Sequence, residues 1–286
     1  MRSKHHIVVS AENNCYMAWQ CKLFHYSCIK HLGLRPVFIV HELDRGWHPY
    51  FKDIVAAGGV VRSAPSYRRT TPGHDYSPRN TAGTLLHAAL IGYSKDDFIV
   101  LCDADMIFLR AIVFPERFAA EGCSNLNYDD KRVLSAAVRF GIDGKLLAKR
   151  KNSIECAVPH IVPVSDAGKL AQVWLDAIDC FDPGVWQTSM YAFGFAVLKL
   201  KLKLVLTRLV ALNDEPEEKI GRARIVHYSY GDKRWNKRDY WYGKDAAKVW
   251  KPVVDARRGT VLGEIISQIR DANNFYRSGS RYAPQQ

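Results

Sequence analysis

An alternation of strand and helix patterns over the first hundred residues is the feature that most constrains the fold. Short apolar runs bounded by turn residues alternate with segments in which apolar residues recur every three to four positions. Strands are expected at 6–10, 36–42, 60–64 and 98–102, and helices from Asn13 or Asn14 to Leu32, at 50–57 and from near Asn80. This order, with short connections, predicts an α/β fold with a mostly parallel sheet flanked by helices.

The second half of the chain is less regular. Amphipathic patterns predict helices at 165–181, 185–198 and 259–273. In VLKLKLKLVL, Lys199, Lys201 and Lys203 alternate with leucines, a period of two that predicts a strand with one solvent-facing side. Residues 224–230 have a further strand pattern.

Charge and cysteine content narrow the classes of function. A net charge of +12 over 286 residues favours an anionic partner, which is a nucleic acid, an acidic membrane surface or a phosphorylated small molecule. Seven cysteines without a C-x-x-C pair argue against both a disulfide framework and a thiolate zinc site. With no N-x-[ST] sequon and no apolar run long enough to span a membrane, we expect a soluble cytoplasmic protein; the alternative is a Golgi or ER enzyme without its anchor.

Two carboxylates separated by one residue directly follow the expected strand at 98–102. Asp103 and Asp105 lie between the apolar runs FIVLC and MIFL, which is not the setting of an exposed turn. The carboxyl ends of strands are where open α/β sheets bind ligands. Extended backbone points both side chains to the same side, so their oxygens can converge on one divalent cation. A cation held there would bridge the phosphates of a nucleotide diphosphate.

A second group of candidate residues lies in IVHYSYGDKRW. His227 follows a strand pattern and would add an imidazole as a third metal ligand. Gly231 would let the backbone approach a phosphate closely, and Lys233 would add a compact positive charge. The alternative is a core histidine in an aromatic cluster, with Lys233 on a solvated loop.

The D-x-D pair together with H-x-x-x-G-x-K resembles the metal- and diphosphate-binding signature of GT-A glycosyltransferases that use UDP-sugars. More broadly, the chain resembles the plant and algal peptidyl-serine galactosyltransferases and hydroxyproline O-arabinosyltransferases. The similar blocks are HIVVSAENNCYMAWQCKLFHY, FIVLCDADMIFLR, MYAFGFAV, and IVHYSYG before a W…KRDY stretch. The chain departs from that family at Ser189, where the family has a glutamate, and in D-A-D, which replaces E-P-D.

The resemblance implies one GT-A domain, a Rossmann-like fold, over residues 1–286. Its parts would be a nucleotide-binding half at 1–110, an acceptor half with the histidine-containing strand at 111–250, and a C-terminal helix and tail at 251–286. Mn²⁺ or Mg²⁺ would be held by Asp103, Asp105 and His227. The UDP-sugar donor would further contact Ser10, Ala11, Arg79, Asn80, Ala104, Gly231 and Lys233. The implied reaction transfers xylose, arabinose or galactose to a hydroxyl of a glycan or glycoprotein.

Two residues are candidates for the acceptor side of such a reaction. Asp182 is a candidate base for an inverting enzyme, and Gln187 is a candidate polar partner on the sugar face of a retaining one. The alternative for Asp182 is an ordinary Asp-Pro-Gly turn, and for Gln187 a residue of the first helical turn.

Two other classes of function stay open. A nucleotidyltransferase acting on sugar phosphates also uses paired carboxylates, but SAENNC after the first strand lacks the glycines of a triphosphate loop. A basic nucleic-acid-binding module would account for the charge and for the aromatic residues of WNKRDYWYG. It would leave the acidic pair unexplained, because carboxylates repel phosphates. We therefore expect no nucleic acid partner.

Overall fold

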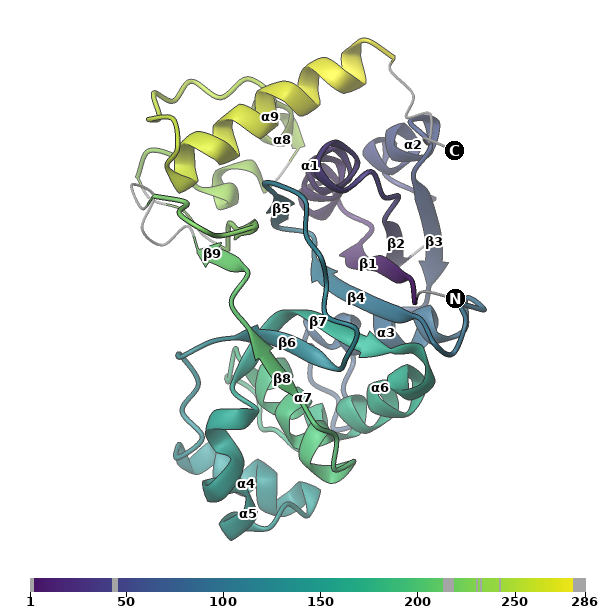
Figure 1. Ribbon diagram of the computed structural model, residues 1–286, viewed down its shortest axis with the longest axis vertical. Helices are drawn as coiled ribbons and strands as arrows, with labels where there is room; N and C mark the ends of the chain where they lie inside the picture. The colour runs from purple at the N-terminus through teal and green to yellow at the C-terminus, as the bar shows by residue number, and fades with distance from the viewer. Residues whose placement is uncertain are drawn as a thin grey trace. The chain divides into compact units, whose positions relative to one another are not determined.

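The computed structural model describes residues 3–42, 46–212, 219–229, 231, 233–241 and 243–279. A seven-stranded sheet has the strand order β3-β2-β1-β4-β7-β6-β8, and a three-stranded sheet has the order β5-β10-β9. The larger sheet is mostly parallel and flanked by helices, so the predicted α/β class is confirmed. The arrangement of the elements can be followed in Figure 1.

The elements of the first hundred residues agree closely with the sequence patterns. They are β1 (His5–Glu12), α1 (Cys15–Leu32), β2 (Val37–His41), α2 (Pro49–Ala56), β3 (Val60–Ala64), α3 (Arg79–Ala89) and β4 (Phe98–Asp103). The side chain of Asn14 accepts a hydrogen bond from the backbone N–H of Met17 and so caps α1. Gly33 ends the same helix in the left-handed conformation, at φ 65°.

The remaining elements are shorter and more varied. They are β5 (Met106–Phe108), β6 (Ala119–Gly122), α4 (Lys131–Phe140), α5 (Gly144–Arg150), η1 (Lys151–Ser153), β7 (Cys156–Pro163), α6 (Val164–Ile178), α7 (Thr188–Lys199), β8 (Val205–Thr207), β9 (Val210–Leu212), β10 (Ile225–His227), η2 (Lys237–Tyr240), α8 (Gly243–Lys248) and α9 (Val261–Arg277). Strand β7 runs antiparallel to both of its neighbours, β4 and β6. The three helices predicted in this half are present as α6, α7 and α9.

The strand predicted for the alternating lysines and leucines is wrong. Helix α7 continues to Lys199, and only Val205–Thr207 of the following segment forms a strand. Nearly all of α7 from Thr188 to Leu198 is buried, so helical packing outweighs the local period of two. A left-handed residue, Lys201 at φ 55°, separates the helix from the strand.

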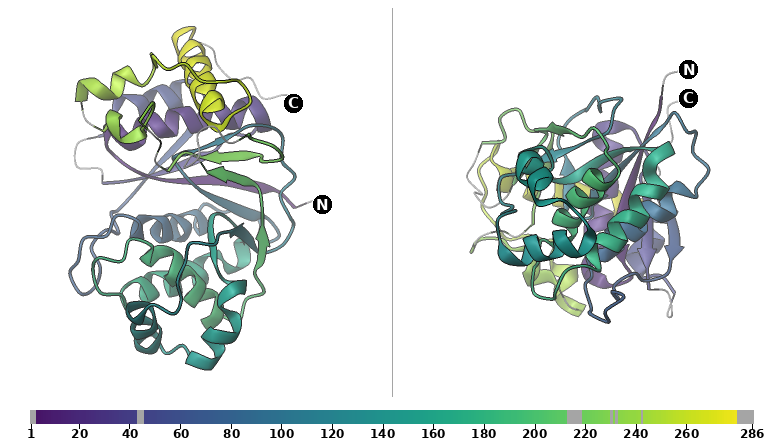
Figure 2. Two further views of the ribbon diagram at one scale, coloured as in Figure 1. Left: turned by 90° about the vertical axis from the view of Figure 1, so that its left-hand side faces the viewer. Right: turned by 90° about the horizontal axis from the view of Figure 1, so that it is seen from below.

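The chain forms two compact units. Unit 1 comprises residues 1–10, 64–102 and 114–208, and unit 2 comprises residues 11–63, 103–113 and 209–286. In unit 1, α6 packs against both α3 and α7, and these helices form a layer beside the strands (Figure 2). The core of this layer includes His160 of β7, whose ring stacks on Phe193 at 3.9 Å between centroids.

Unit 2 is built around α1. This helix contacts α2, β5, α8 and α9. Its buried face joins an aromatic core that contains Trp19, Tyr228 and Trp235, all at most 1% exposed. The ammonium group of Lys22 lies within 4.3–5.4 Å of the ring centroids of Tyr50, Trp250 and Tyr276.

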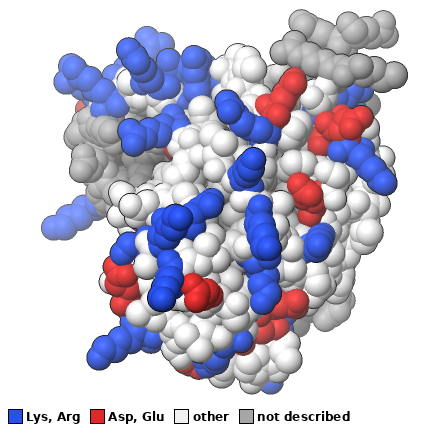
Figure 3. All heavy atoms as spheres, turned by 60° about the horizontal axis from the view of Figure 1, so that its bottom comes forward, with Lys and Arg blue, Asp and Glu red and all other residues white. Residues whose placement is uncertain are grey.

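Three features of the whole described chain bear on function. None of the seven cysteines, all of which lie within the described residues, forms a disulfide bond. Among the described residues, no helix combines the length and apolar character that a membrane crossing requires. The surface is rich in cations, and on the face drawn in Figure 3 lysine and arginine side chains prevail over acidic ones.

Candidate metal centre

One strand pairing in unit 2 brings the two predicted metal-binding segments together. Strand β10 pairs antiparallel with β5, and His227 lies opposite Met106 in this register. Because Met106 directly follows Asp105, the pairing places the imidazole beside the end of β4, where the acidic pair begins. Three residue pairs thus bring together His227 and Asp105, which are 122 residues apart along the chain.

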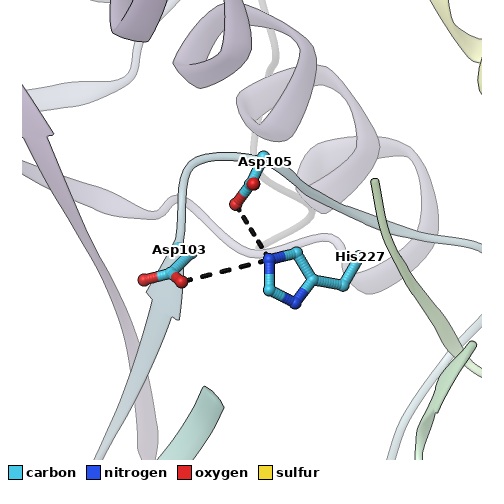
Figure 4. A group of neighbouring side chains, drawn as sticks. All are labelled: Asp103, Asp105 and His227. Atoms are coloured by element: carbon cyan, nitrogen blue, oxygen red, sulfur yellow. Dashed lines mark hydrogen bonds and ion pairs between the residues drawn. The ribbon is translucent and has the colours of Figure 1, made fainter. Parts of the chain in front are cut away.

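The three side chains converge on a common point (Figure 4). His227 Nε2 lies 3.1 Å from Asp105 Oδ1 and 4.0 Å from Asp103 Oδ2. One ligand atom from each residue lies within 4.8 Å of the others, a spacing that suits a shared metal ion. The side chain of Asp103 is 37% exposed, whereas those of Asp105 and His227 are 12% and 15% exposed. A solute would therefore reach the centre from the side of Asp103.

The donor set fits a divalent cation that accepts both oxygen and nitrogen. Carboxylate oxygens suit Mg²⁺ and Mn²⁺, while an imidazole nitrogen favours transition metals. Since the ring of His227 presents Nε2 to both carboxylates, this nitrogen is the one that would bind the ion.

Burial and mutual charge shift the pKa values of all three groups. Burial raises the pKa of Asp103 to about 6, and the carboxylate of Asp105 adds to the rise. Burial acts in the same direction on Asp105, but the charges of Lys237 and then His227 hold its pKa well below its usual range. For His227, burial lowers the pKa, but the two carboxylates more than offset it and the pKa is raised.

Lys237 is a fourth member of the cluster that the sequence patterns did not single out. It lies at the start of η2, is 9% exposed, and donates a hydrogen bond to Asp105 Oδ2. Its ammonium group lies 5.9 Å from the centroid of the Tyr16 ring, and its pKa is raised because Asp105 and Tyr16 outweigh the effect of burial. Asp105 thus turns one oxygen toward His227 and the other toward an ammonium group. In the sequence, Lys237 belongs to the W…KRDY block that carries the family resemblance, but no role was predicted for it.

Backbone contacts hold the loop between the two aspartates in place. Ala104 is 1% exposed, and its carbonyl accepts a hydrogen bond of 3.4 Å from the hydroxyl of Tyr228. The backbone N–H of Tyr228 donates to the carbonyl of Asp105 at 2.9 Å. The residue after His227 therefore fixes the loop that carries the acidic pair.

Gly231 and Lys233 lie in the loop that leads from β10 to Lys237. Gly231 has φ 147° and forms a bridge with Asn236. A Cβ atom at this position would meet the carbonyl oxygen of Trp235 at 2.1 Å, so the close packing of the loop requires glycine. Lys233 is exposed in this loop, and the buried cation beside Asp105 is Lys237.

The other residues predicted to contact the donor lie in two places. Ser10 and Ala11 belong to β1, near its carboxyl end, and are 7% and 1% exposed. Arg79 and Asn80 open α3 in unit 1. The guanidinium group of Arg79 donates to Asp179 at 2.9 and 3.0 Å.

The contacts of Arg79 and Asn80 organise the segment before α3. Arg79 also donates to the carbonyl oxygens of Tyr67 and Arg69, at 2.9 and 3.2 Å. The side-chain oxygen of Asn80 accepts from the backbone N–H of Tyr67 at 2.7 Å. Both residues therefore have a structural role inside unit 1.

The two candidate catalytic residues also belong to unit 1. Asp182 is exposed and accepts two hydrogen bonds from Arg139, at 2.8 and 2.9 Å. Hydrogen bonding to Arg139 lowers the pKa of Asp182, which weakens it as a base in this state. Gln187 is the N-cap residue that directly precedes α7, and its carbonyl oxygen accepts from the backbone N–H groups of Met190 and Tyr191.

The fold and this site define an α/β protein with a candidate divalent-cation centre. No protein-family model matches the chain. No curated protein matches it either. Among solved structures, one similar chain is a bifunctional glycosyltransferase, WbbM, in its apo form, with a TM-score of 0.49 and 12% sequence identity over 98% of this chain. The match covers 52% of the WbbM chain, so this protein spans about half the length of that structure.

Proposed function

We propose that the protein is a metal-dependent glycosyltransferase of GT-A architecture that transfers a sugar from a UDP-sugar to a hydroxyl group. The observation that carries the proposal is the convergence of Asp103, Asp105 and His227 at the carboxyl end of β4. Open α/β sheets bind ligands at this end of their strands. A structural role alone does not require two carboxylates to lie together, since each raises the free energy of the other's charge.

The charges of the cluster suit an anionic ligand bound through a cation. Mn²⁺ or Mg²⁺ bound there would neutralise negative charge on a diphosphate leaving group. Asp103, Asp105 and His227 would hold the ion. The ammonium group of Lys237 would add one positive charge to the site. The net positive charge of the protein favours the approach of the same anion.

An aromatic surface beside Lys237 gives a place for the uracil ring. Tyr16 stacks on Trp241 with 4.2 Å between ring centroids, and Trp241 remains 43% exposed. The ammonium group of Lys237 lies 5.9 Å from the centroid of Tyr16. Stacking on an exposed tryptophan accepts any base, so specificity for uracil would come from other contacts.

The remaining assignments of the proposal rest on the resemblance. Residues 1–286 would form one GT-A domain, and Ser10, Ala11, Arg79, Asn80, Ala104, Gly231 and Lys233 would line the donor site. The transferred sugar would be a pentose or galactose, and the acceptor a glycan or glycoprotein. Asp182 would act as the base of an inverting reaction, or Gln187 would support the sugar in a retaining one.

Thermal unfolding with UDP and Mn²⁺ tests the donor half of the proposal. A ligand at about 100 times its dissociation constant stabilises the folded state by roughly 2.7 kcal/mol. We expect this stabilisation with the wild type, and its loss in Asp103→Asn and His227→Gln. Asp96→Asn, an exposed aspartate outside the cluster, is the matched control and keeps the stabilisation.

Donor hydrolysis then tests the reaction. UDP-galactose, UDP-xylose, UDP-arabinose and UDP-glucose are each incubated with the protein and Mn²⁺, and released UDP is measured. The proposal expects turnover of at least one donor, and its loss in Asp103→Asn. UDP binding that survives both substitutions, or stabilisation by an oligonucleotide in place of UDP, contradicts the proposal.

A further inference from the structure

Two neighbouring helices of unit 1 carry a dense group of cations on their exposed faces. Residues 131–153, which contain α4, α5 and η1, include seven basic residues and one acidic residue. Three of the seven, Arg132, Arg139 and Lys151, form ion pairs with aspartates outside these helices. Lys131, Lys145 and Lys149 are exposed and have no carboxylate partner within the described part of the chain. The end of unit 1 that bears α4 and α5 in Figure 1 is turned forward in Figure 3, where basic side chains prevail.

A third segment extends this cationic surface. Residues 199–208 contain four basic residues and no acidic one. Lys199 lies against the end of α4, where its ammonium group donates to the carbonyl oxygen of Phe140 at 3.3 Å and lies 5.4 Å from that ring's centroid. Lys201 and Lys203 follow and are exposed. We call α4, α5 and residues 199–203 the basic helical surface.

Large apolar side chains are exposed among these cations. Val138 is 73% exposed, and Leu134, one helical turn earlier on α4, is 39% exposed. On α5, Leu146 is also 39% exposed, between Lys145 and Lys149. The interior side of the same helices is filled by other residues, such as Val133, Ala137 and Leu147, so these three are not needed for the core.

We propose that the basic helical surface binds the surface of a membrane that contains anionic lipids. Cations alone would suit any polyanion, but a bilayer interface also takes up apolar side chains that lie beside them. A nucleic acid site would be expected to offer exposed aromatic rings for stacking, and the exposed large apolar residues here are aliphatic. The helices would lie in the interface plane, which requires no membrane-spanning segment.

This proposal stands apart from the glycosyltransferase assignment. It uses residues of unit 1 only, and none of them belongs to the cluster of Asp103, Asp105 and His227 in unit 2. Vesicle binding and metal-dependent UDP binding therefore succeed or fail separately.

Vesicle sedimentation of the full chain tests the proposal. At about 0.1 M salt we expect binding to vesicles of phosphatidylcholine with 30% phosphatidylserine, and at least tenfold weaker partitioning to phosphatidylcholine alone. A triple charge reversal on the surface, Lys145→Glu, Lys149→Glu and Arg150→Glu, is expected to reduce partitioning to the anionic vesicles at least tenfold. The matched control reverses three exposed lysines elsewhere, Lys52, Lys95 and Lys251, and so makes the same change in net charge.

A second pair of variants separates insertion from charge. Val138→Asn is expected to weaken vesicle binding severalfold, whereas Val138→Leu keeps it, because only the first removes the apolar contact and neither changes the net charge. Circular dichroism confirms that each variant is folded. The proposal is overturned if the wild type does not bind anionic vesicles, if the control triple loses as much binding as the surface triple, or if an oligonucleotide but no vesicle is bound.

Discussion

The two units distribute charge in opposite ways. In unit 2, Asp103, Asp105, His227 and Lys237 bring charges of both signs together in one largely buried cluster. In unit 1, the basic helical surface spreads charges of one sign over exposed helices. Buried charges of mixed sign are costly unless each has a partner, and so they mark a site for a small ligand or ion. Exposed like charges cost little and suit an extended anionic partner.

The largest expected effect comes from removing one carboxylate of the buried cluster. Asp105→Asn takes away a metal ligand and leaves Lys237 as a buried cation with no carboxylate partner. Breaking a buried ion pair from one side costs about 3–5 kcal/mol of stability. We expect that loss in urea unfolding, and a fall in Mn²⁺ affinity of at least about 100-fold in calorimetric titration. Unchanged Mn²⁺ affinity would show that the ion binds elsewhere.

The next effect compares a buried histidine from each unit. Burial lowers the pKa of His160 in unit 1 and of His25 in unit 2 to about 3 in both cases. Each is neutral when folded and takes up a proton when unfolded below about pH 6.5. Stability is therefore fully present above that pH and is lost toward pH 3, by about 1.4 kcal/mol per pH unit for each residue.

Substitution by phenylalanine separates the two histidines. The ring nitrogens of His160 have no hydrogen-bond partner among the described residues, whereas His25 Nδ1 lies 2.6 Å from the hydroxyl of Tyr276. Both His160→Phe and His25→Phe should flatten the acid dependence of unfolding measured between pH 7 and 4. At pH 7, only His25→Phe should lose about 1 kcal/mol, from the broken hydrogen bond. Equal free energies of unfolding for the two variants at pH 7 would contradict the expected difference between His25 and His160.

Acid should also weaken the metal centre. The pKa of Asp103, at about 6, and the raised pKa of His227 mean that both groups gain protons as pH falls through this range. Since a metal binds the deprotonated forms, Mn²⁺ affinity should drop at least about tenfold from pH 7.5 to 5.5. Titration of the protein with Mn²⁺ at each pH, in buffers of equal ionic strength, measures this drop in affinity. A flat profile would place the ion on groups that stay ionised throughout.

The smallest expected effect is a change in the affinities for two ligands, in opposite directions. Lys237→Met removes a cation that shares Asp105 with the metal, so Mn²⁺ alone should bind about threefold to tenfold more tightly. The same change removes positive charge near a diphosphate, so UDP in the presence of Mn²⁺ should bind about threefold to tenfold more weakly. Calorimetric titration of each ligand separates the two. A loss for both would mean that Lys237 acts mainly by orienting Asp105.

The sequence predicts the local elements of unit 2 better than the contacts that build its site. Patterns of period 2 and 3.6 located the strands and helices of the first hundred residues to within two or three residues, because those patterns follow from burial of one face. They gave no prediction for α4, α5 and α8, or for β5, β6, β7 and β9. They failed at Lys199 to Lys203, where burial of α7 determines the structure. The position of Asp103 and Asp105 after a buried strand could be predicted from the sequence, because it depends on neighbouring residues alone.

The partners of the acidic pair depend on contacts between distant segments. The register of β10 on β5 brings His227 to Asp105, and no local pattern gives that register. No role was predicted for Lys237, because its burial depends on the turn at Gly231 and on packing against Tyr16. Arg79 was predicted to contact an anion because it opens a helix, and this stays a prediction. Its ion pair with Asp179 joins residues 100 apart along the chain, which no local pattern gives.

The most direct test of the account is the identity of the atoms around bound Mn²⁺. Electron spin echo envelope modulation detects a nitrogen nucleus bonded to the ion. We predict nitrogen modulation from His227 in the wild type and in the control His74→Gln, and its disappearance in His227→Gln. Modulation that persists in His227→Gln, or Mn²⁺ that does not bind the wild type, would contradict a metal centre formed by Asp103, Asp105 and His227.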